Sequence, residues 1–381
     1  MTDPHVVILG HAADRTGPPV YLLQLLRNLD LRGLRVTIVL LRGGELLPEL
    51  QELAEVRVVG EPADVHRASP TLLAGEPGRV LARRAQLADL HDLALVVVNT
   101  AWSIHSLPWL PEPAPRVVVI VHELTAGVAD ILEPEPLATL LASQRFIAGC
   151  AAVERMLVEE LEVARDRVEV IPYGVELGPA EAPLIPRRQL LASDGAFVVV
   201  AAAVPDRRKG PDLFVHLAAT ARRRRPDIRW AFRWIGADEA DARLHDALVD
   251  RALLDADDLV RFLPPTPELR ATLASADAFV LPSRQDAFPL AAVEAALAGL
   301  PLLCFDSGGI GALVEPGAGA LVPYPDLDAM ATQLATWHDD PAQRGALGAT
   351  GRDRARRHHD VAVHAARFDE AVLGPIRGAG A

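Results

Sequence analysis

The chain has 381 residues, of which 50% are hydrophobic and 23% are charged, and its formal net charge at pH 7 is −13. This length and apolar content are enough for two globular domains with substantial cores. The acidic balance argues against a surface that binds nucleic acid.

Short apolar runs alternate with helical patterns along the first half, which is typical of a parallel α/β domain. The chain enters the first run without the basic region and long apolar stretch of a secretory signal. Helices are expected between the strands, for example over residues 20–29 and 151–161. The expected strands are residues 6–9, 36–41, 56–59, 93–98, 117–121, 145–148 and 168–171.

A Pro- and Gly-rich polar segment, residues 178–190, is expected to be a linker, and the alternation resumes over residues 191–355. The simplest architecture is two doubly wound, Rossmann-like α/β domains, residues 1–177 and 191–355, facing each other across a cleft. Residues 356–381 would add a terminal helix. The expected strands of the second half are residues 197–203, 229–235, 259–263, 278–281 and 300–305.

No stretch approaches eighteen apolar residues, so no transmembrane helix is expected. Cys150 and Cys304 lie near apolar segments and are expected to be buried thiols, in agreement with a cytoplasmic location. Four arginines, residues 222–225, end an expected helix, where cations interact favourably with the dipole. We interpret them as a solvated helix end; the alternative is a contact with an acidic partner or, peripherally, with the inner face of the membrane.

Residues 281–309 carry the most informative pattern of the chain. A buried strand leads into a loop with Asp286, and Pro289 opens a helix that carries Glu294. The N–H groups and dipole at a helix N-terminus favour an anion. The two carboxylates can bond hydroxyl groups on either side of a phosphate held there, as a nucleotide-sugar site requires. In the structural alternative, Asp286 caps the helix and Glu294 is a solvated helix residue.

This block resembles the E-x7-E signature of the retaining GT-B glycosyltransferases of family 4, with Asp286 at the first acidic position. The resemblance extends along the neighbouring residues, from Ala276 to Leu290. It implies a GT-B fold, in which the first domain binds the acceptor, the second binds the nucleotide-sugar, and the last helix crosses back to the first domain. It also implies that Phe288, Pro289 and Leu290 present the helix N-terminus to the donor.

A basic loop, residues 206–210, joins another buried strand to a helix that starts at Pro211. The corresponding loop of family 4 presents an arginine and a lysine to the donor diphosphate, and the lysine precedes a glycine. Lys209 fits this pattern directly. Arg208 or Arg207 fits the arginine, although the commoner form places it on the other side of the loop. Cations held there would stabilise the charge that develops on the leaving diphosphate. An ordinary basic loop is the alternative.

Two loops of the first half complete the candidate site. Residues 10–19 lack the G-x-G-x-x-G fingerprint of nicotinamide-binding domains. They resemble the glycine-containing first loop of GT-B enzymes, which would place Gly17 over the donor phosphates. His122 ends a strand at the edge that faces the ligand in such folds, and its Val-His-Glu segment resembles that of many family 4 enzymes. There the histidine contacts the donor sugar; a structural histidine is the alternative. Residues 99–103 are a candidate acceptor contact.

The resemblance implies a retaining transferase that moves a hexose from a UDP- or GDP-sugar co-substrate to a hydroxyl of a glycan, a lipid-linked or a small-molecule acceptor. Lys209 and Arg208 would hold the diphosphate and Glu294 the ribose hydroxyls. Asp286 would hold sugar hydroxyls, and His122 would support the anomeric region. The catalytic candidates are therefore His122, Lys209 and Asp286. Neither a cofactor nor a metal is implied, because basic residues and a helix dipole replace the metal in such enzymes.

Asp286 departs from the family pattern. Aspartate is one methylene shorter than glutamate, so its carboxylate lies about 1.5 Å further back. Three consequences of the shorter side chain stay open: the loop of Asp286 moves forward, the donor sugar differs from the usual one, or catalysis is impaired. Two other functions therefore stay open. One is a non-catalytic glycosyltransferase-like subunit that binds nucleotide or serves as a scaffold. The other is a GT-B nucleotide-sugar epimerase or hydrolase.

Overall fold

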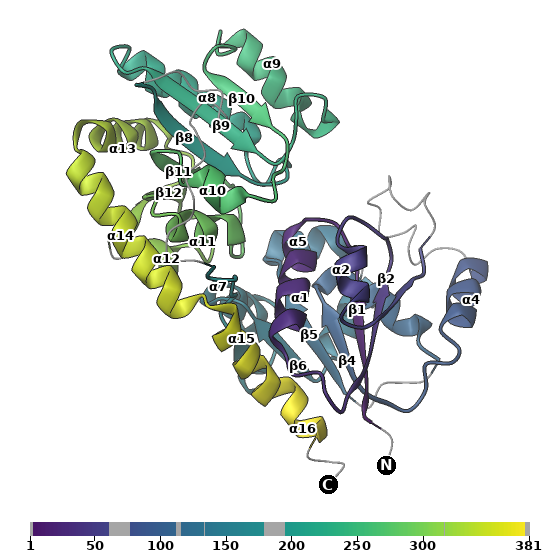
Figure 1. Cartoon of the computed structure of the whole chain (residues 1–381). Helices are drawn as coiled ribbons and strands as arrows, with labels where there is room; N and C mark the ends of the chain where they lie inside the picture. The colour runs from purple at the N-terminus through teal and green to yellow at the C-terminus, as the bar shows by residue number, and fades with distance from the viewer. Residues whose placement is uncertain are drawn as a thin grey trace. The chain divides into compact units, whose positions relative to one another are not determined.

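The computed structural model describes residues 3–60, 77–111, 116–132, 134–178, 195–315 and 317–377. The chain divides into two compact units, one formed by residues 1–176 together with 361–381, the other by residues 177–360 (Figure 1). The final residues, from Val361, therefore belong to the first unit. The linker expected over residues 178–190 lies, after Gly178, outside the described residues.

A seven-stranded parallel sheet in the order β3-β2-β1-β4-β5-β6-β7 forms the centre of the first unit. Each strand lies within one residue of its predicted bounds. The inner strands are buried apolar runs that the sequence shows clearly, whereas the edge strands β3 and β7 are only partly buried. The strands are β1 (His5–Gly10), β2 (Arg35–Leu40), β3 (Glu55–Val58), β4 (Leu93–Asn99), β5 (Val117–Val121), β6 (Arg145–Ala148) and β7 (Val168–Val170).

Helices connect these strands, and the C-terminal segment returns to pack against α1 (Gly17–Asn28) (Figure 1). That segment comprises α15 (Val361–Phe368), a π-helical turn (Asp369–Leu373) and α16 (Gly374–Arg377). The remaining helices are α2 (Leu47–Gln51), α4 (Pro77–Gln86), a 3₁₀ segment (Ala101–Trp109), α5 (Thr125–Ile131), α6 (Pro134–Leu141), α7 (Ala151–Arg155), a π turn (Met156–Glu160) and a 3₁₀ turn (Arg165–Arg167).

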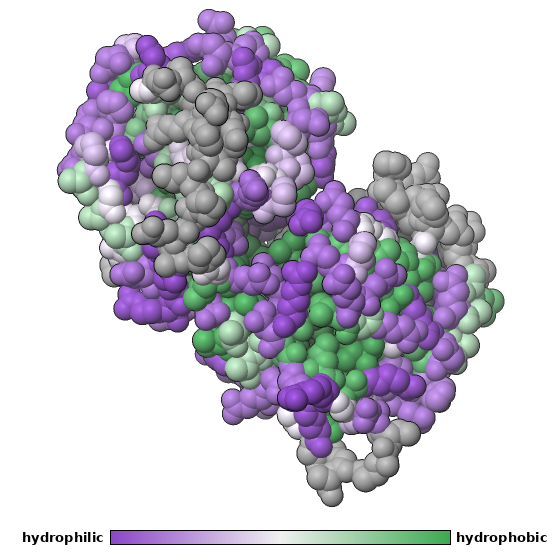
Figure 2. Space-filling model, in the orientation of Figure 1, coloured by the Kyte–Doolittle hydropathy of each residue, from purple (hydrophilic) through white to green (hydrophobic). Residues whose placement is uncertain are grey.

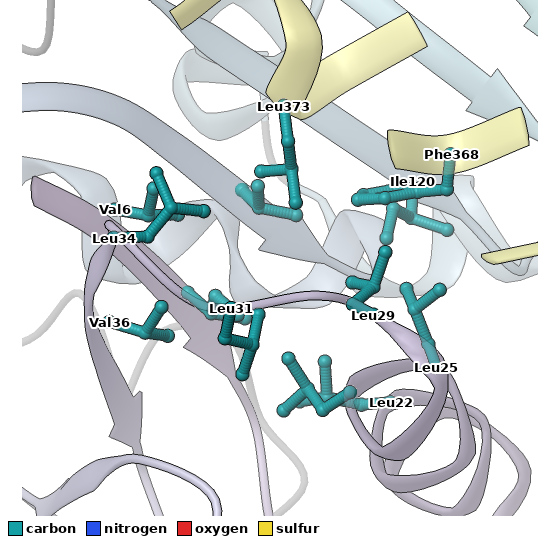
Figure 3. A pocket seen from close by; sticks show the side chains of 13 residues that line it. Val6, Leu22, Leu25, Leu29, Leu31, Leu34, Val36, Ile120, Phe368 and Leu373 are labelled. Atoms are coloured by element: carbon teal, nitrogen blue, oxygen red, sulfur yellow. The ribbon is translucent and has the colours of Figure 1, made fainter. Parts of the chain in front are cut away.

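A small cavity of about 20 Å³ lies between α1, the sheet and the C-terminal segment (Figure 3). Its lining is entirely apolar and includes Leu25, Leu29, Phe368 and Leu373. A water there would have no polar partner, so we interpret the cavity as a dry packing defect. Apolar side chains also gather on the visible surface of the first unit (Figure 2).

The second unit contains a six-stranded parallel sheet in the order β10-β9-β8-β11-β12-β13. Five of its strands were predicted; β13 was not, because its four residues begin with Gly-Ala and give only a short apolar run. The strands are β8 (Phe197–Ala202), β9 (Trp230–Ile235), β10 (Val260–Leu263), β11 (Ala278–Leu281), β12 (Leu302–Phe305) and β13 (Gly319–Val322).

The helices of the second unit cover both faces of its sheet. On one face, α8 packs with α13 over an apolar core that includes the buried side chains of Phe214, Trp234 and Trp337. Elsewhere in the unit, α11 packs against α14. The helices are α8 (Pro211–Arg224), a 3₁₀ turn (Ala242–Leu244), α9 (His245–Leu253), α10 (Leu269–Leu273), α11 (Leu290–Leu297), α12 (Gly311–Val314), α13 (Leu327–Asp339) and α14 (Pro341–His358).

Each sheet reverses its strand order once beside its first strand, between β1 and β4 in the first unit and between β8 and β11 in the second. The loops that leave the carboxyl ends of two such strands run in opposite directions and open a crevice, which is where ligands bind in folds of this kind. The sequence-predicted site residues lie at this edge in both units, on the loops that follow the strands or on the helices that begin there.

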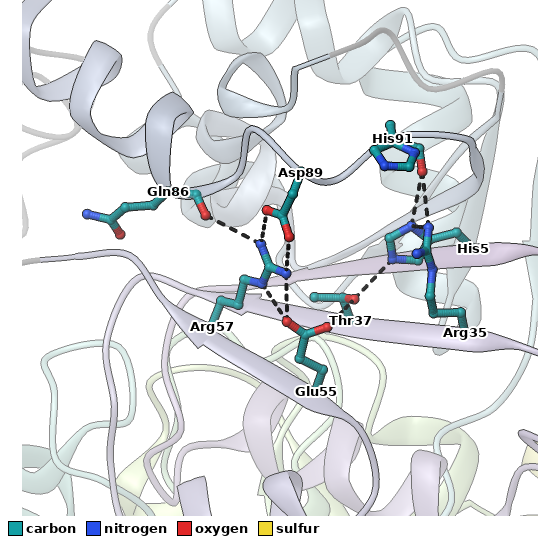
Figure 4. Close-up of polar contacts among 8 residues, drawn as sticks. All are labelled: His5, Arg35, Thr37, Glu55, Arg57, Gln86, Asp89 and His91. Carbon is teal, nitrogen blue, oxygen red and sulfur yellow. Dashed lines mark hydrogen bonds and ion pairs between the residues drawn. The ribbon is translucent and has the colours of Figure 1, made fainter.

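The amino edge of the first sheet is occupied instead by a polar network (Figure 4). Arg57 donates to Asp89 at 2.5 and 2.8 Å and to Glu55 at 2.7 Å, and its hydrogen bond holds the pKa of Asp89 below its usual value. Buried His5 contacts the Thr37 hydroxyl through Nε2 at 3.0 Å. The groups of this network bond one another, so we interpret it as structural.

Three expectations about the rest of the chain can be compared with the structure. Cys150 and Cys304 are buried thiols that form no disulfide, as predicted. No helix in the described ranges is long and apolar enough to cross a membrane. The prediction that residues 222–225 form a solvated helix end is only partly correct. Arg222, Arg224 and Arg225 each donate to an aspartate of the same unit.

Candidate functional site

The switch point of the second sheet brings the predicted basic and acidic loops together. Lys209 follows β8 and Asp286 follows β11, and these two strands pair although the two residues are 77 positions apart. The Lys209 ammonium donates to Asp286 Oδ2 at 2.5 Å. The side chain of Asp286 is only 5% exposed and that of Lys209 17%. The two predicted catalytic residues of this unit therefore form a mostly buried ion pair.

Arg284 fastens the two loops to each other. Its backbone N–H donates to the carbonyl of Arg208 at 2.8 Å, and its guanidinium donates to both oxygens of Asp212 at 2.9 and 2.5 Å. Burial raises the pKa of Asp212, but the hydrogen bonds and charge of Arg284 outweigh that effect and hold the pKa below its usual value. The loop that carries Lys209 is thus clamped against the loop that carries Asp286.

Gly210, directly after the lysine, is required by the backbone. It lies in the left-handed region with φ of 74° and immediately precedes α8. A Cβ at this position would lie 2.4 Å from the carbonyl oxygen of Pro282, on the acidic loop. Only glycine combines this φ with so close an approach, which gives the Lys-Gly pair of the sequence a physical reason.

The backbone of Asp286 is held by the turn that follows β12. Its N–H donates to the carbonyl of Ser307 at 3.0 Å, and its own carbonyl accepts from the N–H of Gly309 at 3.3 Å. Asp286 also forms a parallel bridge with Gly308. The short aspartate is therefore fixed in place, and the long side chain of Lys209 spans the distance to it.

Arg208 lies beside this pair and is the more accessible cation. Its guanidinium is 3.8 Å from Asp286 Oδ1 and donates to the carbonyl of Gln285 at 3.2 Å. With 44% of the side chain exposed, it can reach a ligand that approaches the ion pair from solvent. The structure thus brings Lys209, Arg208 and Asp286 together.

Glu294 is placed on α11 and has a different partner. Its carboxylate accepts from Arg270 Nε at 2.7 Å, and both side chains are less than one-fifth exposed. Arg270 also donates to the carbonyl of Leu177, where the chain enters the second unit. A ribose that binds Glu294 would therefore meet a carboxylate whose orientation Arg270 already fixes.

The start of α11 follows the prediction closely. Pro289 is the N-cap residue and Leu290 is the first helical residue. Buried Phe288 stacks on His359 with ring centroids 4.9 Å apart and 30° between the planes. The residue that precedes the N-cap is thus held in place by an aromatic contact within the same unit.

His122 follows β5 in the first unit and is surrounded by aromatic rings. It stacks on Tyr173 at 5.2 Å and 15°, and meets the edge of Tyr21 at 5.0 Å. Its Nε2 lies 3.0 Å from Asn99 Oδ1. Burial, aided by the nearby His11 and His364, lowers the pKa of His122 to about 3. The imidazole is therefore neutral near pH 7 and cannot act there as an effective acid or base.

Glu123, the residue after the histidine, connects the segments that follow β4 and β5. Glu123 accepts from the backbone N–H groups of Ala101 at 3.2 Å and of His122 at 2.9 Å. Burial raises its pKa, while these hydrogen bonds lower it and leave a net increase. Gly17, the remaining predicted residue, is the exposed first residue of α1. Across the described ranges, no group of three or more His, Cys, Asp or Glu side chains could hold a metal ion.

Two family models match most of the chain. The model described as "Glycosyltransferase Family 4" matches residues 15–178, and "Glycosyl transferases group 1" matches residues 195–340. A relative from Nocardia farcinica, named D-inositol 3-phosphate glycosyltransferase, is 31% identical over 93% of this chain and 82% of its own. The chain belongs to glycosyltransferase family 4. A relative of the same name from Kineococcus radiotolerans is 30% identical over 90% of this chain and 87% of its own.

Solved structures confirm the GT-B class of this family 4 enzyme. Anabaena HepE, solved in complex with UDP-glucose, superimposes with a TM-score of 0.79 at 17% identity and covers 97% of this chain and 99% of its own. Sucrose-phosphate synthase from Thermosynechococcus elongatus superimposes with a TM-score of 0.78 at 21% identity, and each chain is covered completely. At sequence identities of 17% and 21%, the similarity to these two structures shows the fold alone.

Sequence reasoning missed the residues that hold the site residues in place. Tyr21 and His364 could not be connected, since 343 positions separate them. The clamp between Arg284 and Asp212 depends on strand order, which spacing along the chain does not reveal. Asn99 was predicted only as part of a candidate acceptor contact, residues 99–103, and its contact with His122 was not predicted.

Proposed function

We propose that this family 4 enzyme transfers a hexose from a UDP- or GDP-sugar to an acceptor hydroxyl, with retention at the anomeric carbon and without a catalytic metal. In this proposal, Lys209 and Arg208 bind the donor diphosphate and Asp286 binds hydroxyls of the sugar. Glu294 binds the ribose, and His122 lies near the anomeric centre.

The observation that carries the proposal is that Lys209 is the only lysine in the chain. The composition counts 38 lysines and arginines together, and every other one is an arginine. That the single lysine of the chain stands at this position suggests that an ammonium is needed here and that a guanidinium would not replace it. An ammonium is a compact charge with three rotatable donors, whereas a guanidinium is broad and planar. Lys209 can therefore keep its bond to Asp286 and still donate to a phosphate oxygen.

The transfer needs no protein nucleophile. The bond between the anomeric carbon and the diphosphate oxygen breaks, and the acceptor oxygen forms its bond to that carbon on the same face. The proton of the acceptor hydroxyl passes to the leaving phosphate oxygen. Lys209 and Arg208 stabilise the negative charge that develops there. His122, with its lowered pKa, serves as a hydrogen-bonding group and takes no proton.

The relatives suggest which substrates to test first. Anabaena HepE was solved with UDP-glucose, so UDP-sugars come before GDP-sugars. Several relatives are named D-inositol 3-phosphate glycosyltransferases, so a cyclitol phosphate is the first acceptor to test. Glycan and lipid-linked acceptors remain the other classes.

Calorimetry with UDP and GDP tests the donor site. We expect micromolar binding of one nucleotide, weakened at least tenfold in Lys209→Ala and Glu294→Ala, because each loses a charge-assisted hydrogen bond. Lys209→Arg should also lose affinity, because the broad guanidinium cannot replace the compact ammonium. Arg224→Ala is the matched control, since it removes one exposed charge of the same unit, paired with Asp328, and should bind as the wild type does.

Product analysis with UDP-glucose then separates the remaining functions. A glycosylated acceptor supports the transferase. Release of free sugar without an acceptor indicates a hydrolase, and an altered nucleotide-sugar indicates an epimerase. A folded protein that binds neither nucleotide would refute the donor site and leave the scaffold role.

A further inference from the structure

Asn99, the last residue of β4, spans the switch point of the first sheet. Its side chain is buried, and its Nδ2 donates to the carbonyl oxygen of Pro18 at 3.1 Å. A carbonyl oxygen can only accept a hydrogen bond, so this end of the amide must be the NH₂ group. The first turn of α1 therefore decides which way the amide of Asn99 faces.

The other end of the same amide faces the histidine. Asn99 Oδ1 lies 3.0 Å from His122 Nε2. An amide oxygen only accepts, so Nε2 must carry the hydrogen. A neutral imidazole has one N–H, so the Nδ1 of His122 carries a lone pair. The two hydrogen bonds that connect Pro18, Asn99 and His122 thus allow only one tautomer of the imidazole.

Packing holds the imidazole ring in the plane that this chain of bonds requires. Tyr173 stacks on it and Tyr21 meets it edge-on. Tyr21 is itself held by a 2.6 Å contact between its hydroxyl and Nε2 of His364, from the C-terminal segment. In the part of the chain that the structure describes, no hydrogen bond reaches Nδ1 of His122.

The backbone that follows Asn99 is fixed as well. Thr100 has φ of 101°, which a β-branched residue adopts only when its surroundings impose it. Glu123 holds the N–H of Ala101 and also that of His122. One carboxylate thus joins the segment that presents the amide to the segment that presents the ring. Strain held in this way is common where a group must be placed accurately.

From this geometry we propose that Asn99 is a positioning residue that fixes His122 as the Nε2–H tautomer and leaves Nδ1 as a hydrogen-bond acceptor. The inference rests on the proposed function and deepens it, because it states what His122 offers the substrate. A group that binds Nδ1 must donate a hydrogen, as a sugar hydroxyl does and a phosphate oxygen or a carbonyl does not.

Nitrogen-15 NMR of histidine-labelled protein without ligand tests the tautomer directly. The signal of His122 is assigned by its absence in His122→Gln. We expect the proton on Nε2 in the wild type, and its loss from that position, with Nδ1–H or a mixture, in Asn99→Leu. A wild-type Nδ1–H tautomer, or an unchanged tautomer in a folded Asn99→Leu variant, would overturn the inference. Neither result depends on donor binding, so a failure of the proposed function is detected separately.

Asn99→Asp adds a kinetic test that a merely structural role would not satisfy. The carboxylate still accepts from Nε2–H but stabilises the imidazolium, so kcat/KM should gain an acid limb that the wild type lacks above pH 5. The other titratable groups around the ring are Tyr21 on α1, Tyr173, His11 on the first loop and His364 on α15. Glu123 bonds the backbone of the same residue.

The matched control uses Asn28, the only other asparagine in the chain. Its side chain is exposed and bonds only the carbonyl of Gln24 in its own helix. Asn28→Asp should keep the wild-type pH profile, while Asn99→Leu should lose roughly tenfold in kcat, the value of one hydrogen bond. An acid limb in both aspartate variants, or in neither, would count against Asn99.

Discussion

At the residue scale, Asp286 is the position where this chain departs from its family, and the structure predicts the outcome of restoring glutamate. The carboxylate is 5% exposed, it already meets Lys209 at 2.5 Å, and its backbone is held by Ser307 and Gly309. An additional methylene would move the carboxylate about 1.5 Å into that contact. We expect Asp286→Glu to raise the donor KM about tenfold, since overpacking costs ~1–3 kcal/mol.

The alternative, that aspartate impairs catalysis, predicts the opposite sign. If Asp286→Glu increased kcat/KM, the aspartate would be a defect of this chain and the scaffold role would gain support. Asp286→Asn is the companion variant. It keeps the volume and removes the charge opposite Lys209, so binding of UDP alone should survive while transfer falls. Steady-state kinetics and calorimetry on the same preparations separate these effects.

At the element scale, the clamp between α8 and the acidic loop gives a second prediction. Arg284 and Asp212 form a bidentate pair whose side chains are about one-quarter exposed. Removal of either partner leaves a mostly buried charge without its partner and frees the loop that carries Lys209. We expect Arg284→Met and Asp212→Leu each to lower the melting temperature and to weaken nucleotide binding. The double variant should lose much less than the sum, as a double-mutant cycle would show.

This clamp also has a defined pH dependence. The pKa of Asp212 is lower in the folded chain, so the stability from the pair is present above the unfolded pKa, near 3.8, and is lost as the pH falls through the folded value. Wild-type binding measured at pH 8 and pH 6 should therefore show no contribution from this titration. Additive losses in the double variant would show that the two residues act separately.

The sequence predicted strands more reliably than it predicted the contacts between loops. A buried parallel strand is an apolar run that can be recognised alone, and this explains why the inner strands were predicted. The edge strands β3 and β7 were also predicted although they are only partly buried, and β13 was missed. Lys209 and Asp286 could be assigned to one site because each lies, after a buried strand, in a motif that resembles one of family 4. Their 2.5 Å contact, and the Arg284 clamp behind it, depend on β8 and β11 being neighbours. Strand order is a property of the whole sheet and leaves no local signal.

At the scale of the whole molecule, both sheets place their candidate residues on the same kind of edge. In each unit the carboxyl ends of the strands carry the predicted residues. This is why a histidine at a strand end could be singled out from the sequence. The surroundings that decide its chemistry come from distant segments, since His364 lies in the C-terminal segment and bonds Tyr21 of α1. They required the folded structure.

The first unit should be the acid-sensitive part of the chain. Burial lowers the pKa of His11 and His364 to about 4 and that of His122 to about 3. The unfolded chain, with histidine pKa values near 6.5, binds more protons between pH 6.5 and 4, so stability is fully present above about pH 7 and falls as the pH falls. Each of these three histidines contributes a slope of up to about 1.4 kcal/mol per pH unit. The raised pKa of Glu123 acts in the opposite direction.

Thermal unfolding between pH 8 and pH 5 measures this dependence. His364→Gln removes one of the groups that must lose a proton to fold, so its melting temperature should fall less steeply with decreasing pH, although the lost bond to Tyr21 lowers it at pH 8. His245→Gln, on the exposed start of α9 in the second unit, is the matched control and should keep the wild-type slope. Equal slopes in all three proteins would mean that His364 accepts a proton in the folded state. The interior around His122 would then be wetter than its packing indicates, and the neutral imidazole on which its proposed role depends would need direct measurement.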